Sequence, residues 1–395
     1  MKTIKKFSYL FTVALATVIG FASCSSDDDN GTDVNPTGKT KEVSLSISIG
    51  SNTQLRADGP SAVGLTPDVA DLTLYFYDGT GNILSTQQFP ISGSLPAGTT
   101  METFTVPAAA TKIYAIGNTG AISGSITFAS PLANITDLKS SFIHIDKQTH
   151  PQNAVNVKGE ATITAGTPSS ASIELRAVVA RIEVKEIKSA LETNVVATPL
   201  TSFKVTNIFI NNTYMKFPLN ETLPSSGLVA ADILNFDKSV WGSPFPAIYS
   251  AAGAIYRDDN SAATAGTSHT PSGAVWGYFV PATTGAANGT TFPDPTDDGS
   301  GAVKQENVPH IILEITDATA TGMVIPAKQY VTVKGLKKAS DGSSVANLAG
   351  GYYYIINSLN IGAEHLTTAP EDPKVELEVT VEVKPWEEVE VLPEI

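Results

Sequence analysis

The chain is dominated by segments in which apolar and polar residues alternate with the period of a β-strand. The first is Val43–Ile49, where Val43, Leu45, Ile47 and Ile49 are apolar and serines occupy the positions between them. Because successive side chains of a strand point to opposite faces, this segment predicts a strand with one buried apolar face.

Comparable β-rich runs follow along the chain, and many are bounded by Gly, Pro, Asn or Asp. Predicted strands lie at 72–77, 104–106, 112–116, 173–184, 203–210, 278–280, 310–315, 329–333, 352–356 and 375–383. Short helices are predicted at 135–142 and 186–193. Many strands without a regular alternation of strand and helix predict an all-β chain of antiparallel β-sandwiches.

The length of 395 residues suits two domains. Two series of strands are separated by a polar segment around residues 186–200. We therefore predict an N-terminal β-sandwich over residues 42–190 and a C-terminal β-sandwich over residues 191–395.

The N-terminus has the pattern of a secretory leader. Lys2, Lys5 and Lys6 precede an uncharged stretch over residues 7–22. A basic start followed by an apolar stretch and small residues is typical of a signal peptide, which we assign to residues 1–23.

The single cysteine of the chain, Cys24, directly follows this leader. Small residues immediately before a cysteine resemble a bacterial lipobox, in which the cysteine carries the lipid. Residues 24–41 then read as a flexible acidic tether. The protein would contact a membrane only through the lipid on Cys24.

The composition excludes several classes of function. A formal net charge of −14 and a pI near 4.8 argue against a nucleic-acid partner, because an acidic surface does not neutralise phosphates. One cysteine excludes intrachain disulfides and a cysteine-based zinc site. We predict no cofactor and no metal.

No catalytic motif is apparent. The five histidines are at positions 144, 150, 269, 310 and 365, and none is paired with another at helical spacing. Asp294–Gly299 resembles the start of a calcium loop, but Thr296 and Gln305 occupy two ligand positions, so it reads as a turn. A carboxylate pair assembled by the fold stays open, yet no residue marks one. We predict that the chain is not an enzyme.

The two ends of the chain carry similar alternating segments. Residues 375–383 repeat the alternation of residues 43–49, with Val followed by Leu at the start of both. The two segments could present nearly the same side chains to one groove. The apolar and aromatic positions of this C-terminal region are Val375, Leu377, Val379, Val381, Val383, Trp386, Val389 and Val391.

A polar, turn-rich segment over residues 50–60 separates the first strand from the rest of the chain. Such segments are preferred sites of proteolysis, and the bond between Arg56 and Ala57 suits an arginine-specific protease. The cut would free Cys24–Arg56 together with the first strand. The vacated groove would accept a strand from another chain, and a head-to-tail contact of this kind builds a filament.

Three further segments resemble the fimbrillins, the shaft subunits of Bacteroidetes type V pili. They are Leu175–Val184, Gly350–Asn357 and Val379–Trp386. The resemblance implies two tandem transthyretin-like β-sandwiches, a lipoprotein precursor and arginine-specific cleavage before assembly.

Carried over to this sequence, the resemblance implies lipidation at Cys24, cleavage between Arg56 and Ala57, and removal of a strand at about 42–50. The donor strand would lie within residues 375–395. The expected partners are copies of the same chain in a head-to-tail filament, minor pilus subunits and an arginine-specific surface protease. The expected location is the outer membrane and the cell-surface pilus, where the subunit supports adhesion.

Other functions share some of these features. A pilus anchor would keep its lipid and need no cut at Arg56. A tip adhesin or a glycan-binding surface lipoprotein would share the leader but need no donor tail. A surface hydrolase would require a carboxylate pair that the sequence does not indicate.

Overall fold

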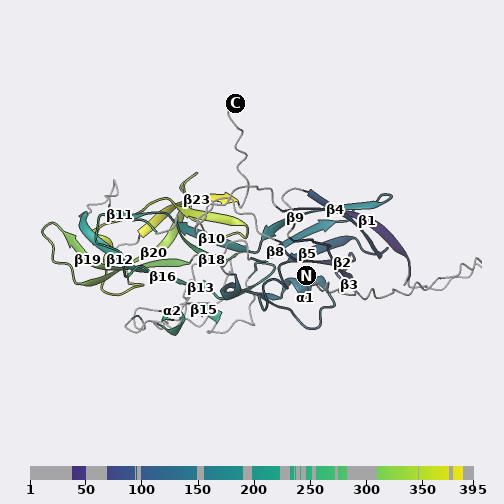
Figure 1. Cartoon of the computed structure of the whole chain (residues 1–395), viewed down its shortest axis with the longest axis horizontal. Coiled ribbons are helices and arrows are strands. Elements are labelled where there is room, and N and C mark those ends of the chain that lie inside the picture. Colours follow the sequence, from purple (N-terminus) through teal and green to yellow (C-terminus); the bar gives the residue numbers. More distant parts are fainter. Residues whose placement is uncertain are drawn as a thin grey trace, which may run out of the picture. The chain divides into compact units, whose positions relative to one another are not determined.

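The structure is a computed structural model of the whole chain (Figure 1). Thr40–Ile395 falls in one compact unit. The described residues are 38–49, 69–93, 95, 99–148, 155–189, 198–222, 232–234, 236, 241, 246–250, 255–271, 275–282, 309–345, 347–372 and 377–385.

The first half of the described chain builds a seven-stranded sheet. Its strands, in chain order, are β1 (Thr40–Ile49), β2 (Leu72–Tyr77), β3 (Ile83–Gln88), β4 (Thr99–Pro107), β5 (Lys112–Gly117), β8 (Val157–Thr162) and β9 (Ser169–Ala177). Their spatial order is β3-β2-β5-β8-β9-β1-β4. The N-terminal strand therefore lies inside the sheet and not at its edge.

The second half builds an eight-stranded sheet. Its strands are β10 (Val179–Val184), β12 (Leu200–Asn211), β16 (Arg257–Asp259), β18 (Trp276–Pro281), β19 (His310–Ala320), β20 (Lys328–Lys338), β21 (Tyr352–Ile356) and β23 (Leu377–Pro385). Their spatial order is β16-β12-β19-β20-β23-β21-β10-β18. The C-terminal strand β23 is thus also internal to its sheet.

Smaller elements cover and connect the two sheets. Three small sheets contain β6 (Ile126–Thr127), β7 (Phe142–His144) and β14 (Lys216–Pro218); β11 (Ile187–Ser189), β17 (Ser268–His269) and β22 (Leu359–Ile361); and β13 (Thr213–Tyr214) with β15 (Ile233–Leu234). The helical elements are α1 (Ile135–Lys139), α2 (Ala247–Ser250), η1 (Ile145–Lys147) and η3 (Ala363–His365). Pairing of β14 with β7 joins the second half of the chain to the first.

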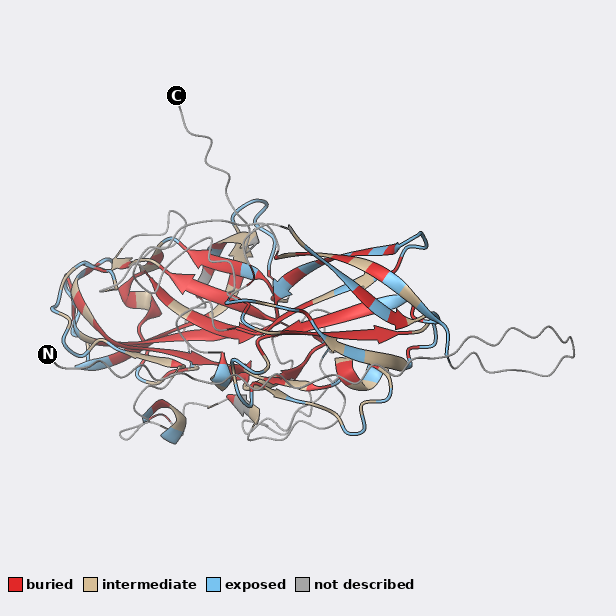
Figure 2. Ribbon diagram, turned by 45° about the vertical axis from the view of Figure 1, so that its right-hand side comes forward, coloured by how far each residue is buried: buried red, intermediate tan, exposed pale blue. Residues whose placement is uncertain are grey.

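The first sheet curves around an apolar core that its own strands enclose (Figure 2). Its two edge strands approach each other, since Gln87 Nε2 on β3 donates to the carbonyl oxygen of Thr105 on β4 at 2.9 Å. The ring of Phe104 lies 5.9 Å from the rings of both Phe76 and Phe89. The sheet thereby buries one face without a second full sheet.

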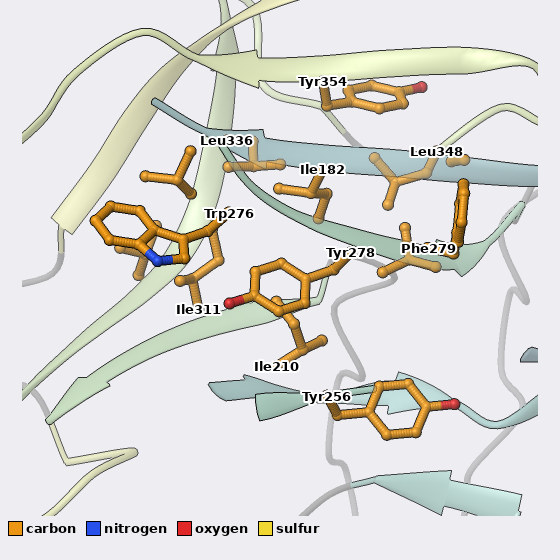
Figure 3. Packing of buried hydrophobic residues seen from close by; sticks show 14 of the residues in the cluster. Ile182, Ile210, Tyr256, Trp276, Tyr278, Phe279, Ile311, Leu336, Leu348 and Tyr354 are labelled. Atoms are coloured by element: carbon orange, nitrogen blue, oxygen red, sulfur yellow. The ribbon is translucent and has the colours of Figure 1, made fainter. Parts of the chain in front are cut away.

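A second core packs against the eight-stranded sheet (Figure 3). Ile182 from β10, Tyr278 from β18 and Ile311 from β19 meet in it, although they are distant in sequence. The same core continues to Tyr75 and Tyr114 of the first sheet. Branched and aromatic side chains of this kind favour strands because they pack well on a pleated surface.

The predicted all-β fold is confirmed. The sheets are mixed and not purely antiparallel, however. Parallel neighbours are β1 with β9, β10 with β21, β11 with β22 and β20 with β23. Each parallel pair joins strands that are far apart in sequence, and the alternation pattern contains no information about direction.

Two details differ from the sequence predictions. The run 173–184 is not one strand, since β9 ends at Ala177 in the first sheet and β10 begins at Val179 in the second. The described chain thus passes from the first sheet to the second at Val178. The predicted helix at 186–193 is wrong over its described part, where Ile187–Ser189 forms a strand because it pairs with β22 and β17.

The helix predicted at 135–142 is present as α1 but is shorter. Asn134 caps it, with its side-chain oxygen accepting from the backbone N–H of Thr136 at 2.9 Å. Ser141 lies beyond its C-terminal cap, and Phe142 already belongs to β7.

Candidate strand-exchange site

Strand β1 is paired on both edges along nearly its whole length. Thr40–Ser48 pairs antiparallel with β4, and Val43–Ile49 pairs parallel with β9. In the described sheet β4 has β1 as its one ladder neighbour. Removal of β1 would therefore leave unpaired backbone donors and acceptors on two facing strands.

The predicted alternation of β1 is present in the fold. Val43, Leu45 and Ile47 are completely buried, and Ile49 is nearly so, while the serines between them are partly exposed. Burial of four such aliphatic side chains contributes about 6–12 kcal/mol at about 1.5–3 kcal/mol each. The strand is thus a large part of the core that it completes.

Aromatic and aliphatic side chains form the wall around these positions. Phe104 of β4 stands opposite Val43, and Ile173 and Leu175 of β9 stand beside Ile47 and Ile49. All belong to one buried cluster. Any segment that replaced β1 would need a branched apolar residue at every second position to fill the same space.

Strand β23 is held differently, because among the described strands each of its residues has a ladder partner on one edge alone. Leu377–Val381 pairs parallel with β20, and Glu382–Pro385 pairs antiparallel with β21. Leu377, Val379 and Val381 are buried, and Val383 packs against the same core. In this chain the predicted donor residues 377–383 therefore lie within the chain's own second sheet.

Several predicted site residues lie outside the described part of the chain. They are the lipidation site Cys24, the cleavage residues Arg56 and Ala57, and the tail residues Val375, Trp386, Val389 and Val391. The calcium-like loop at 294–305 also lies outside it. These assignments stay predictions.

An ionic cluster that the sequence analysis missed lies at the end of β9. Glu221 Oε1 is 2.7 Å from Lys158 Nζ on β8 and 2.6 Å from Arg176 Nη2 on β9. Lys158 also donates to the carbonyl oxygen of Leu219, and Arg176 Nη1 donates to that of Gly350 at 3.1 Å. We call Lys158, Arg176, Glu221 and Gly350 the β9 anchor.

The anchor is largely removed from water. The side chain of Glu221 is 3% exposed and that of Lys158 is 8%, whereas Arg176 remains 44% exposed. Burial lowers the pKa of Lys158 to about 8, against the attraction of Glu221. Burial raises the pKa of Glu221, but Lys158 and Arg176 outweigh it and the net pKa is lowered. The carboxylate is therefore ionised at neutral pH.

Gly350 makes this close approach possible. A Cβ atom there would lie 2.7 Å from Arg176 Nη1 and 2.9 Å from the carbonyl oxygen of Ala177. No sequence pattern points to the cluster, because its members lie far apart in the chain. The resemblance segments 175–184 and 350–357 do include Arg176 and Gly350, which was the one available signal.

A second ionic pair is completely buried within β10. Arg181 Nε donates to Glu183 Oε1 at 2.7 Å, and the guanidinium lies 5.1 Å from the ring centre of Phe279. A Cβ atom on Gly277 would lie 2.0 Å from Arg181 Nη2. Glycine at this position therefore provides the space for the arginine.

The histidines of the described residues do not gather into a metal site. Among them, no three His, Cys, Asp or Glu side chains are placed to hold a metal ion. His269 Nε2 contacts the carbonyl oxygen of Phe203 at 2.8 Å, and His310 Nδ1 contacts Glu371 Oε2 at 2.9 Å. In the same part of the chain, no helix has the length and apolarity needed to cross a bilayer.

The comparisons with known proteins find a family match over part of the chain and a shared fold. Residues 36–224, just under half of the chain, match the family model of the fimbrillin-A associated anchor proteins Mfa1 and Mfa2. The search of curated proteins found no significant match.

Solved structures that match the chain come from Parabacteroides distasonis and Porphyromonas gingivalis. A proposed cell adhesion protein from Parabacteroides distasonis is 14% identical, with a TM-score of 0.50, and the match covers 88% of this chain and 100% of that one. A second from the same organism is 12% identical, with a TM-score of 0.51 and coverage of 89% and 98%. A fimbrilin from Porphyromonas gingivalis is 11% identical, with a TM-score of 0.47 and coverage of 88% and 99%.

Two of these structures share the fold over nearly the whole of both chains. Together with the family match over residues 36–224, this confirms the predicted resemblance of the chain to the Bacteroidetes fimbrillins.

Proposed function

We propose that the chain is a structural, non-catalytic subunit of a cell-surface pilus, exported as a lipoprotein and polymerised by protease-triggered strand exchange. The observation that carries this proposal is the placement of β1. It is the first strand of the described chain, yet it fills an internal position of the first sheet between β9 and β4.

A single cut at the bond between Arg56 and Ala57 would leave β1 attached by non-covalent contacts alone. The bond follows the strand in sequence and precedes Val69, where the described chain resumes. Loss of β1 would vacate a slot with hydrogen-bonding groups on both sides and apolar walls. Such a slot accepts an extended segment from another chain by β-augmentation.

The donor is proposed to lie in residues 375–395 of a neighbouring copy. Two parts of this region carry the required alternation, namely residues 375–383 and the segment that contains Val389 and Val391. Insertion of the first part would withdraw Leu377, Val379 and Val381 from the buried core of their own sheet. Insertion of residues 386–395 would leave β23 in place, so we propose this segment as the donor.

The pairing of β23 also bears on this choice. Because each half of β23 is paired on one edge alone, its withdrawal breaks fewer ladder bonds than removal of β1 would. It still exposes three aliphatic side chains, at a cost of about 5–9 kcal/mol. The tail after Pro385 avoids that cost.

A pilus anchor is the second candidate function, and the family match favours it, since the matching model describes anchor proteins. An anchor would keep lipidated Cys24 and would not be cut at Arg56. A tip subunit is the last subunit of the filament. It would donate no strand to a further copy and would need no donor tail.

The test is the N-terminal sequence and intact mass of protein sheared from the cell surface. A chain that begins at Ala57 supports cleavage and polymerisation. A chain that begins at lipidated Cys24 overturns the shaft role and favours the anchor.

A further inference from the structure

Strand β9 depends strongly on β1 for its backbone pairing. Along its β1 edge, every residue from Ser169 to Leu175 has a partner. Along its β8 edge, ladder pairs exist at Arg176 and Ala177 alone, with one further bridge between Ser170 and Thr164. In this described hairpin, residues 171–175 have no ladder pair with β8.

After β1 leaves, β9 would be held at its two ends, and its middle would have no ladder partner. The bridge at Ser170 holds one end, and the backbone N–H groups of Ser170 and Thr164 each donate to the other's carbonyl oxygen. The other end carries Arg176, which the β9 anchor holds. A groove whose wall could move would lose its shape before a new strand arrived, and ordering the wall again would weaken binding.

We infer that Glu221, together with Lys158 and Arg176, positions β9 so that the slot vacated by β1 stays shaped for an incoming strand. This inference rests on the function proposed above and assigns positioning residues to its acceptor site. The incoming partner is an extended segment of a second copy, with branched apolar residues at alternate positions.

The position of Glu221 makes it a suitable fixed point. The turn at Pro218–Glu221 belongs to the second half of the chain and is fastened to the helix α1 region. The backbone N–H of Leu219 donates to the carbonyl oxygen of Ser141, and that of Asn220 donates to Lys139, both at 2.9 Å. Neither contact involves β1 or β4. Loss of β1 would leave this support intact.

Gly350 provides a second support for the same strand end. Its carbonyl oxygen accepts from Arg176 Nη1, and the N–H of the next residue, Gly351, donates to the carbonyl oxygen of Val179 at 3.0 Å. Both glycines directly precede β21, which pairs with β10 and β23. The wall of the slot is thus fixed against the second sheet.

Burial makes the charges of the β9 anchor depend on one another. Lys158 and Glu221 are almost removed from solvent, so each depends on the other for compensation. Removal of one partner of a buried ion pair is strongly unfavourable, whereas removal of the half-exposed Arg176 leaves no buried lysine unpaired. Glu221→Gln and Arg176→Met would therefore both weaken the β9 anchor, but with different effects on global stability.

The first test measures amide hydrogen exchange in the chain cut at Arg56, from which β1 can leave. The variants are Glu221→Gln and Arg176→Met. The matched control is Glu183→Gln, which breaks the other buried pair without touching β9. We expect residues 171–175 to exchange at least about tenfold faster in both anchor variants than in the control. Equal exchange in all variants overturns the inference.

The second test measures strand uptake after cleavage at Arg56. A labelled peptide with the sequence of residues 40–49, added in excess, competes with the native strand in the cut chain. We expect both anchor variants to hold the peptide about tenfold or more weakly than wild type. The control should match wild type, and Arg176→Lys should recover part of the affinity.

The outcomes separate the inference from the proposed function. If wild type takes up the peptide and the anchor variants hold it equally well, the positioning role is wrong and strand exchange stands. If cut wild type takes up no peptide, strand exchange itself is overturned and the acceptor role of the anchor falls with it.

Discussion

Ile47 of β1 lies directly beside Ile173 of β9 in a parallel pair, and both side chains are completely buried. The two residues are far apart in sequence, and the polar segment 50–60 lies between them. The strand that a cut at Arg56 would release is therefore part of the core and not an appendage. Its loss would require a replacement.

The buried face of β1 should determine the stability of the uncut chain. Leu45→Ala removes a completely buried side chain from the first core, and we expect the free energy of unfolding to fall by about 2–5 kcal/mol. Ser46→Ala, on the outer face of the same strand, should change it by less than about 0.5 kcal/mol. Denaturant unfolding of both variants measures the difference. Equal effects would contradict the assigned faces.

Replacement of Arg56 should block maturation. Arg56→Ala removes the side chain that an arginine-specific protease recognises, so we expect the chain to stay uncut, lipidated and monomeric. Intact mass measures cleavage and lipidation, and electron microscopy of sheared material measures filament formation. Normal filaments from this variant would show that the trigger lies elsewhere.

Two deletions and one substitution test the donor assignment. Removal of residues 386–395 spares β23 and should yield a folded subunit that accepts a strand but donates none. Val389→Asp in the full-length chain should reduce filament formation in the same way, since a charge would enter an apolar slot. Filaments from the 386–395 deletion and from Val389→Asp would exclude residues 386–395 as the donor. If removal of residues 375–395 abolishes filaments and removal of residues 386–395 does not, the donor lies in residues 375–383.

The buried pair in β10 predicts a severe effect at Gly277. A Cβ atom there would lie 2.0 Å from Arg181 Nη2, and Arg181 is held by Glu183 and packed on Phe279. Because the Arg181 side chain is completely buried, Gly277→Ala should lower the free energy of unfolding by about 1–3 kcal/mol. Gly79→Ala, where no atom lies within 4 Å, is the control. Thermal unfolding that gives the same midpoint for both variants would refute the packing argument.

Buried tyrosines predict a loss of stability in alkaline solution. Burial raises the pKa of Tyr114 and Tyr256, and burial together with Glu314 raises that of Tyr330 to about 12. The unfolded chain loses these protons near pH 10, the ordinary tyrosine value, while the folded chain keeps them. The unfolded state therefore binds fewer protons above pH 10, and the free energy of unfolding falls as the pH rises.

Tyrosinate absorbance and circular dichroism, followed together in a pH titration, check this prediction. We expect most tyrosinate to form as the protein unfolds. Full ionisation near pH 10 with an unchanged circular dichroism spectrum would contradict the buried positions.

Local patterns were a good guide to the elements. Alternation of apolar and polar residues identified β1 and its buried face, because side-chain period alone determines which residues share a face. The same pattern at 173–184 did not reveal the break at Val178, since both strands that meet there are fully buried on at least one face. The segment 186–193 was misassigned because pairing with β22 and β17 overrides its weak local preference.

No local sequence pattern predicted the β9 anchor. Lys158, Arg176 and Glu221 are ordinary charged residues at unrelated positions, and one glycine gives no sign that an arginine lies against it. The approach of the two halves of the chain brings the Glu221 carboxylate within 2.7 Å of both Lys158 and Arg176. Their burial then gives them their altered pKa values.

The sequence by itself determined the fold class, the face that β1 buries and the resemblance to fimbrillins, because these depend on local periodicity and short segments. Tertiary structure decided that β1 lies between β9 and β4, that β23 belongs to its own sheet, and that β9 is fastened to the second half of the chain. Strand neighbours and their directions result from long-range hydrogen bonding and burial, which no local pattern specifies.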